Sequence, residues 1–123
     1  MALHNELGRQ GEQLAKAHLE AAGYEIMDEN WCYGKAEVDI IAYHNKTIIF
    51  IEVKARSGNY FGEPEDFVDN RKQKLLAKAA DEYIYLMNHQ GEARFDIVSI
   101  LFNKSGGHTL KHIQDAFWPS PSI

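Results

Sequence analysis

The sequence predicts an α/β fold in which a central mixed β-sheet is flanked by helices, in the order α-β-β-β-α-β. Three observations support this prediction. Apolar residues recur at helical spacing in two segments, 3–22 and 70–88. Three strand-like runs lie between these helices, and a further run, RFDIVSILF, follows the second helix. A strand–helix–strand order implies a parallel pair of strands, whereas short turns imply antiparallel pairs, so the sheet should be mixed.

The length and composition are those of one globular domain. The chain has 123 residues, of which 45% are hydrophobic and 25% charged. We expect a single domain over residues 1–116 and a C-terminal tail over 117–123. The only cysteine, Cys32, excludes an internal disulfide and a zinc site built from several thiolates.

The charge balance limits the ways in which a nucleic acid could be bound. Thirteen basic and eighteen acidic residues give a formal net charge of −5. Non-specific nucleic-acid binders are usually basic, so such a partner would need a local basic patch. The start of the chain lacks the features of a signal peptide, and apolar runs such as Ile48–Ile51 are too short to cross a bilayer. We therefore expect a cytoplasmic protein without a membrane partner.

The first helix is expected over residues 3–22, and Gly23 is a plausible end signal. Gly8 and Gly11 lie inside it, and each costs ~1 kcal/mol relative to alanine. Both therefore predict a close approach to another element. The apolar stripe comprises Leu7, Leu14, His18 and Ala22, with Ala15 and Leu19 beside it.

The three strands that follow are expected at about 24–31, 37–43 and 47–55. The turn His44-Asn45-Lys46 predicts an antiparallel hairpin of the second and third strands. The third strand contains TIIFIEV, which is apolar at both alternating sets of positions. This pattern is typical of a strand that is covered on both faces.

A loop over 57–66 precedes the second helix, for which Asp69 is the candidate N-cap. Tyr60 and Phe61 in the loop could stack on unpaired bases or cover the core, whereas Phe67 is expected in the core. Strands are expected at 94–102 and, more weakly, at 109–113. The inward stripe of the helix is expected to contain Leu76, Ala80, Tyr83 and Met87, with Leu75, Ala79 and Ile84 alongside.

The chemistry is concentrated in two strands. Glu52 and Lys54 are two residues apart and so share one face of a strand, about 6.6 Å apart. The hairpin register brings Asp39 close to them. One explanation is an ion pair of Lys54 with Glu52 or Asp39. The other is a hydrolytic site: two carboxylates from adjacent strands hold a hard cation, and the lysine orients or deprotonates a water that attacks a phosphodiester.

Asp39 followed after twelve residues by Glu52-Val53-Lys54 is similar to the signature of the PD-(D/E)xK nuclease superfamily. Four motifs extend this resemblance from Gly8 to Phe102: Gly8-Arg9-Gln10-Gly11-Glu12, Ala36-Glu37-Val38-Asp39-Ile40-Ile41, Phe50-Ile51-Glu52-Val53-Lys54 with Arg56, and Arg94-Phe95-Asp96. Together they resemble the motifs of the YraN-like family, small bacterial proteins of this superfamily that are related to archaeal Holliday junction resolvases.

The resemblance implies the restriction-endonuclease-like fold and a Mg²⁺ (or Mn²⁺) cofactor. It implies metal ligation by Asp39, Glu52 and the backbone carbonyl of Val53. It further implies that Lys54 is the catalytic lysine and that Glu12 is an auxiliary acidic group from the first helix. The sequence departs from the family pattern at Ala36, where the family usually has glycine.

Two further polar residues are candidates for the catalytic site. Glu12 is either a solvated helix residue or, because small residues surround it, a member of the site. Gln73 begins the inward stripe of the second helix. It either bonds a loop carbonyl or contacts a substrate phosphate or the attacking water.

Basic residues are expected to hold the nucleic acid. A run near the start of the second helix coincides with the end of the helix dipole that favours anions. The alternative is a solvated helix face. The candidate nucleic-acid-binding residues are Arg71, Lys72 and Lys74 of this run, together with Arg9, Lys35 and Arg56.

The sequence thus predicts a hydrolase: a metal-dependent endonuclease that acts on DNA. We expect it to recognise branched, flapped or single-stranded structures, since no signature of sequence-specific readout is present. The alternatives are a nucleic-acid- or protein-binding module that keeps the nuclease fold without turnover, and a protein whose carboxylates only make ion pairs. The oligomeric state stays open. A four-way junction has two-fold symmetry, so cutting one would require a homodimer.

Overall fold

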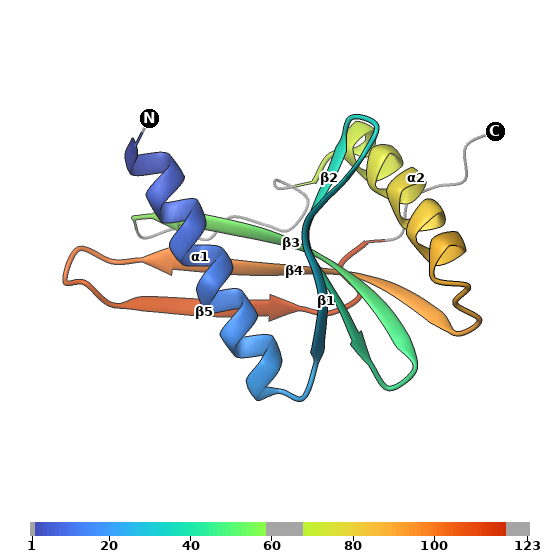
Figure 1. Cartoon of the computed structure of the whole chain (residues 1–123). Coiled ribbons are helices and arrows are strands. Elements are labelled where there is room, and N and C mark those ends of the chain that lie inside the picture. The colour runs from blue at the N-terminus through green and yellow to red at the C-terminus, as the bar shows by residue number, and fades with distance from the viewer. Residues whose placement is uncertain (1, 59–67, 118–123) are drawn as a thin grey trace.

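The computed structural model describes residues 2–58 and 68–117. The loop residues Tyr60, Phe61 and Phe67, and the tail from residue 118 onward, lie outside this part of the chain. Figure 1 shows the arrangement of the helices and strands. Their bounds are α1 Ala2–Ala21, β1 Glu25–Tyr33, β2 Ala36–His44, β3 Thr47–Ser57, α2 Asn70–Leu86, β4 Glu92–Phe102 and β5 His108–Ile113.

The five strands form one mixed sheet in the order β1-β2-β3-β4-β5. All neighbouring pairs are antiparallel except β3 and β4, which are parallel. The β2–β3 turn contains Asn45 and Lys46, with φ angles of 50° and 63°. Two successive left-handed residues are what a tight type I′ hairpin turn requires. The predicted hairpin and the predicted parallel pair are both confirmed.

The two helices cover opposite faces of the sheet. In Figure 1, α1 crosses in front of the strands, whereas α2 lies behind the hairpin of β1 and β2. Strand β3 runs through the middle and is buried on both faces, as its sequence predicts. Ile48 and Phe50 belong to the core cluster under α2, and Ile49 and Ile51 belong to the cluster under α1. This is the predicted α/β class, and the order of elements is that of the restriction-endonuclease-like fold.

The predictions for α1 are confirmed at its end and at one of its two glycines. Gly23 has a φ of +93° and ends the helix, and the Tyr24 N–H donates back to the Leu19 carbonyl at 2.9 Å. A Cβ atom on Gly11 would lie 2.6 Å from the Cβ of Ala55 on β3, so only glycine allows this close approach. The predicted close approach is not found at Gly8, where a Cβ atom would have no neighbour within 4 Å among the residues that the structure describes.

Helix α2 begins as predicted and ends slightly earlier. The carboxylate of Asp69 accepts a hydrogen bond from the Lys72 N–H at 2.9 Å and caps the helix. The inward residues are Leu76, Ala79, Ala80 and Tyr83. Met87 is predicted to be among them, but it follows the last helical residue and is 46% exposed.

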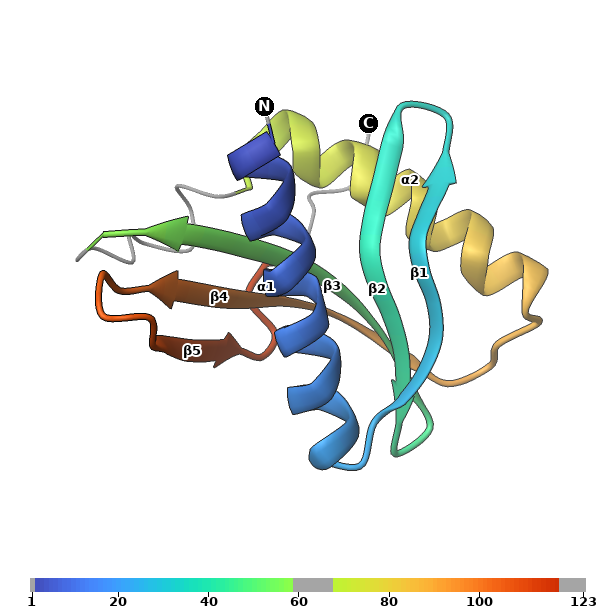
Figure 2. The same cartoon turned by 60° about the vertical axis from the view of Figure 1, so that its left-hand side comes forward.

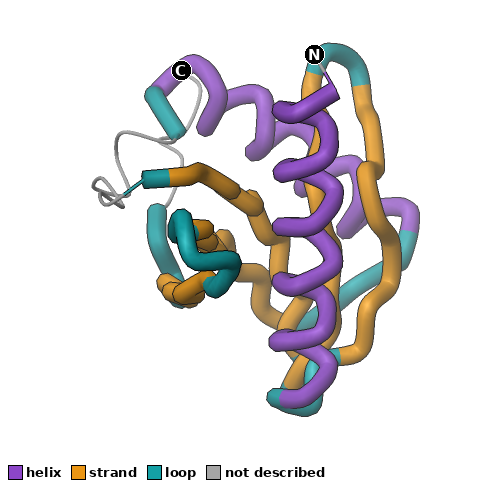
Figure 3. The backbone as a smooth tube through the Cα atoms, turned by 90° about the vertical axis from the view of Figure 1, so that its left-hand side faces the viewer, coloured by secondary structure: helices purple, strands orange, loops and turns teal. Residues whose placement is uncertain are grey.

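The sheet splits between β2 and β3. Their pairing ends at Ile40 and Ile51, whereas β1–β2 pairing continues to Tyr33 and Ala36. Strand β3 continues along β4 as far as Ser57. The β1–β2 hairpin therefore diverges from the other strands, as Figures 2 and 3 show from two directions. The split begins immediately next to Asp39 and Glu52.

The predicted tail is docked at its beginning. Phe117, its first residue, packs its ring against Phe95 at a centroid distance of 5.1 Å. In the described parts of the chain, neither helix combines the length and the apolar character that crossing a membrane requires.

Candidate functional site

Asp39 closes the split in the sheet with its side chain. Its Oδ2 atom accepts a hydrogen bond from the Val53 N–H of β3 at 2.7 Å, a backbone group that β2 no longer pairs. The side-chain alternation of β2 also changes here, because Val38 packs under α2 whereas Ile40 packs under α1. The predicted proximity of Asp39 to the Glu52 end of β3 is confirmed.

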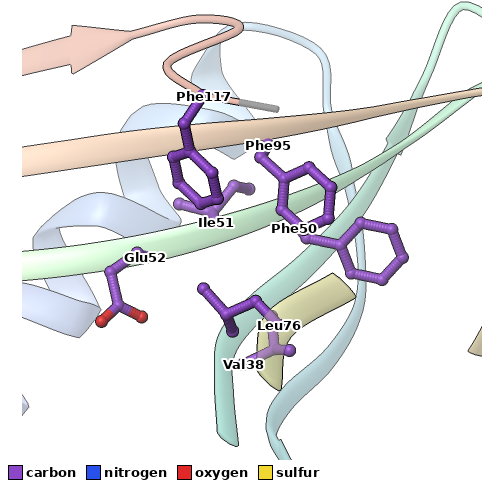
Figure 4. Close-up of a pocket in the computed structure, with 7 residues that line it drawn as sticks. All are labelled: Val38, Phe50, Ile51, Glu52, Leu76, Phe95 and Phe117. Carbon is purple, nitrogen blue, oxygen red and sulfur yellow. The ribbon is translucent and has the colours of Figure 1, made fainter. Parts of the chain in front are cut away.

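Glu52 is the second carboxylate and is nearly inaccessible, with a relative exposure of 8%. It lies at one side of a narrow pocket, with its carboxylate pointing away from the rings of Phe50 and Phe95 (Figure 4). The ammonium group of Lys72, from the first turn of α2, contacts its Oε2 atom. The remaining pocket residues, Val38, Ile51, Leu76 and Phe117, are apolar. Glu52 is therefore a carboxylate at the edge of the core, compensated by a lysine.

The electrostatics of this pair favour a cation. Burial and the neighbouring charge of Glu52 raise the pKa of Asp39 to about 8, and the Glu12 carboxylate contributes in the same direction. The hydrogen bond from Val53 opposes this rise without cancelling it. A carboxyl group whose ionisation is disfavoured by a neighbouring carboxylate is stabilised in its charged form when a cation binds between the two.

Glu12 of α1 lies close to the two carboxylates. Burial raises its pKa, and the charges of Glu37 and Glu52 raise it further, whereas a hydrogen bond with the Asn30 side chain lowers it. The structure thus supports the placement of Glu12 near the site rather than in free solvent. The sequence alone does not single out Asn30 as a member of this group. It lies in β1 opposite Asp39, and its φ of +53° is tolerated well by asparagine.

Lys54 does not form an ion pair with Glu52 or Asp39, which is one of the two explanations for this group of charges. It is half-buried, and it makes no hydrogen bond or ion pair with any residue in the described ranges 2–58 and 68–117. The partner of Glu52 is Lys72 instead. The ammonium group of Lys54 is therefore not engaged by the carboxylates on either side of the split.

Gln73 makes the first of the two contacts predicted for it, a hydrogen bond to a loop carbonyl. Its Nε2 atom donates to the carbonyl of Val68 at 3.1 Å, and the side chain is half-buried. This bond holds the residue that precedes the helix cap.

The six basic candidates differ in their contacts and exposure. Lys72 points inward to Glu52, whereas Arg71 and Lys74 are exposed on the same helix. Arg9 pairs with Glu6 one turn away on the exposed side of α1. Lys35 is exposed at the β1–β2 turn, and Arg56 is half-buried on β3.

The donor set is suited to a hard cation. Asp39 and Glu52 supply carboxylate oxygens, and the Val53 carbonyl would add a third oxygen. Within the described ranges, no three side chains of the types His, Cys, Asp and Glu converge on one metal position. Mg²⁺ commonly binds through one or two carboxylates and completes its shell with water and phosphate oxygens, so the two carboxylates fit it.

Replacing Asp39 by asparagine should stabilise the metal-free fold at alkaline pH. The raised pKa means that the folded protein keeps a proton which the unfolded chain loses above its ordinary pKa of 3.8. The free energy of unfolding of the wild type therefore declines as the pH rises from that value through about 8. The substituted amide would be neutral throughout, and its oxygen can still accept from Val53. One pKa unit corresponds to about 1.4 kcal/mol, so we expect an advantage of at least ~1 kcal/mol at pH ~9.

Urea unfolding with a chelator at pH ~5 and pH ~9 measures this difference. Asp81→Asn, an exposed position on α2, is the matched control and should show no pH-dependent gain. An equal change in unfolding free energy for Asp39→Asn at both pH values would contradict the raised pKa of Asp39 in the folded protein.

Comparison with known proteins places the chain in a family. The model of "Uncharacterised protein family UPF0102" matches residues 11–100. A UPF0102 protein of Christiangramia forsetii is 48% identical over 118 residues, covering 96% of this chain and 98% of that protein. A UPF0102 protein of Flavobacterium johnsoniae is 46% identical over 123 residues, again covering 96% of this chain and 98% of that protein. One from Bacteroides thetaiotaomicron is 42% identical over 119 residues, covering 97% and 98%. The chain therefore belongs to the UPF0102 family, which is the YraN-like family that its motifs resemble.

Proposed function

We propose that this protein is a metal-dependent endonuclease that hydrolyses phosphodiester bonds in DNA and recognises the structure of the substrate rather than its sequence. The observation that carries the proposal is the split between β2 and β3. It brings Asp39 and Glu52 together from two strands and leaves the Lys54 ammonium unengaged by either carboxylate among the described residues.

Each side chain has a role in the proposed reaction. Asp39 and Glu52 would hold Mg²⁺ or Mn²⁺ together with the Val53 carbonyl. When bound, the metal would neutralise charge that develops on the phosphate during in-line attack. Lys54 would orient the attacking water or accept its proton. Glu12 adds negative charge beside the two ligands and would help to hold the hydrated cation.

The proposed substrate follows from the charge distribution. The net charge of −5 makes general attraction of DNA weak, so contacts with phosphates must be local. The exposed Arg71 and Lys74 begin α2 at the end of its dipole that favours anions. The wider set of candidate phosphate contacts adds Arg9, Lys35 and Arg56. Contacts of this kind are blind to sequence, which agrees with recognition of branched, flapped or single-stranded DNA in the cytoplasm.

A second candidate function is a binding module that keeps the nuclease fold but has no turnover. One observation favours it specifically: Glu52 is already compensated by Lys72 in this structure. A site that carries its own cation does not require a metal for stability. Such a module would bind nucleic acid or a protein through the same basic residues.

Mn²⁺ calorimetry combined with a DNA cleavage panel tests the proposal. The panel should contain junction, flap, single-stranded and duplex DNA. We expect the wild type to bind one Mn²⁺ near Asp39 and to cut at least one of these structures. Glu52→Gln should lose the Mn²⁺ site, because a neutral amide replaces a ligand charge, and should cut at least ~100-fold more slowly.

Glu20→Gln, an exposed position on α1, is the matched control and should behave like the wild type. Circular dichroism checks that Glu52→Gln remains folded. Mn²⁺ binding without cleavage of any structure would favour the binding module. An identical Mn²⁺ isotherm for the wild type and Glu52→Gln would rule out the proposed metal site.

A further inference from the structure

Lys72 differs from the other basic residues at the start of α2. Its backbone N–H donates to the Asp69 cap at 2.9 Å, so the first helical turn fixes its position. It precedes the buried Leu76 by four residues and therefore shares the inward side of the helix. Arg71 and Lys74 are exposed on the same helix. The basic run is thus divided: one lysine turns to the candidate site, and its neighbours face solvent.

The contact with Glu52 has an electrostatic reason. The Glu52 side chain is 9% exposed, and a carboxylate at this depth is costly unless a cation compensates it. The carboxyl groups of Asp39 and Glu12 lie near Glu52, since burial and then the charge of Glu52 contribute to the raised pKa of each, so this part of the fold collects acidic side chains. The Lys72 side chain is 43% exposed, so its long stem can reach Glu52 and can also move back into solvent.

A divalent cation and the Lys72 ammonium would compete for one carboxylate. A metal between Asp39 and Glu52 needs an oxygen of Glu52, and its charge repels an ammonium group in contact with that carboxylate. Each cation compensates the same negative charge. The Glu52 carboxylate therefore cannot bind the metal and the Lys72 ammonium equally well at the same time. Binding of one cation weakens binding of the other.

We propose that Lys72 is an exchangeable internal cation of the metal site: it holds Glu52 in the metal-free protein and gives it up when a divalent cation binds. This inference rests on the proposed function, because it takes Asp39 and Glu52 as the metal ligands. Once released, the ammonium group lies at the N-terminal turn of α2 beside Arg71 and Lys74. There it is available to a DNA phosphate, so that the metal prepares part of the surface that binds the substrate.

Mn²⁺ calorimetry on Lys72→Gln tests the exchange without depending on turnover. Removal of the competing ammonium should tighten Mn²⁺ binding about 2- to 5-fold, as expected for a partly exposed ion pair. The matched control is Lys74→Gln, which removes the same charge from the same helix without a contact to Glu52. It should change the affinity by less than about 2-fold. Lys72→Arg keeps the charge and should bind Mn²⁺ as the wild type does.

Thermal unfolding supplies a second readout. Without metal, Lys72→Gln should melt at a lower temperature than Lys74→Gln, because Glu52 is then left uncompensated. Saturating Mn²⁺ should remove this difference, since the metal replaces the lost cation. Equal Mn²⁺ affinities of Lys72→Gln and Lys74→Gln, in a protein that does bind Mn²⁺, would overturn the exchange and leave the proposed function standing. Absence of Mn²⁺ binding in the wild type and in both variants would overturn the metal site itself.

Discussion

Replacing Lys54 by alanine should slow DNA cleavage by at least ~100-fold while leaving the fold intact. A positioned group that transfers or orients a proton contributes roughly 10²- to 10⁴-fold to the rate. The Lys54 side chain is half-buried and makes no hydrogen bond or ion pair with the residues that the structure describes. Its removal therefore breaks no such contact, and we expect a stability change of about 0.5 kcal/mol or less.

Single-turnover cleavage at saturating Mn²⁺, on the DNA structure that the wild type cuts, measures the effect. Lys54→Arg should lose cleavage as well, because a planar guanidinium does not replace a compact ammonium and does not accept a proton at neutral pH. Lys104→Ala, an exposed position between β4 and β5, is the control. Retained Mn²⁺ binding with lost cleavage separates Lys54 from the metal ligands. Cleavage at the wild-type rate would show that Lys54 takes no part in the reaction.

The order and type of the elements could be predicted because apolar periodicity carries that information locally. The run TIIFIEV is apolar at both sets of alternating positions, and β3 is indeed buried on both faces. The ends of helices and strands were less predictable, because they depend on contacts with residues that are distant in the sequence. Strand β4 starts at Glu92 because the parallel partner of that residue, Thr47, begins β3. Met87 shows the limit of a helical stripe, since it follows the last helical residue and is exposed.

The proximity of Asp39 and Glu52 could also be predicted, because the hairpin register fixes it through backbone geometry alone. The contact of Lys72 with Glu52 could not. It joins two elements separated by a loop, and it depends on which lysine of a basic run turns inward. The spacing of four residues between Lys72 and Leu76 was an available signal. Asn30 gave a weaker one, since an isolated asparagine in a strand is only a hint of a left-handed backbone.

A buried ionic network around Asp96 is a further feature that the sequence did not reveal. Asp96 is completely buried on β4 and accepts hydrogen bonds from Arg94 at 2.8 and 3.0 Å. It also accepts from the Asp115 N–H at 2.9 Å and contacts His112 Nε2 at 2.8 Å. The motif Arg94-Phe95-Asp96 identified the family but not this role, because His112 and Asp115 come from the end of the chain.

The network joins three parts of the fold. Arg94 also donates to the Tyr24 hydroxyl at 2.8 Å, which connects β4 to the end of α1. With Nε2–H of His112 directed to Asp96, its Nδ1 atom is free to accept from Nε2 of His18 on α1, at 3.2 Å. Burial alone would raise the pKa of Asp96, but the hydrogen bonds from His112, Arg94 and the Asp115 backbone outweigh it and lower the pKa. The folded state therefore stabilises the charged carboxylate.

Asp96→Ala should consequently be the most destabilising of the substitutions considered, with a loss of ~3–5 kcal/mol in the free energy of unfolding. The variant leaves Arg94 and His112 without their shared acceptor, and a loss of this size lowers the melting temperature by roughly 10–20 °C. Urea and thermal unfolding at neutral pH measure it, with Glu92→Ala, an exposed position on the same strand, as the control.

The pH dependence of unfolding provides a second test of whether the charged Asp96 carboxylate stabilises the fold. Because the folded pKa of Asp96 is lowered, its contribution is fully present above the ordinary value of 3.8 and is lost as the pH falls through the folded pKa. The stability difference between the wild type and Asp96→Ala should therefore be largest near neutral pH and shrink in acid. His18 adds to the acid sensitivity: burial lowers its pKa from 6.5, so stability also declines as the pH falls from that value towards the folded pKa. A difference that stays constant into strong acid would mean that the carboxylate is held by packing rather than by charge.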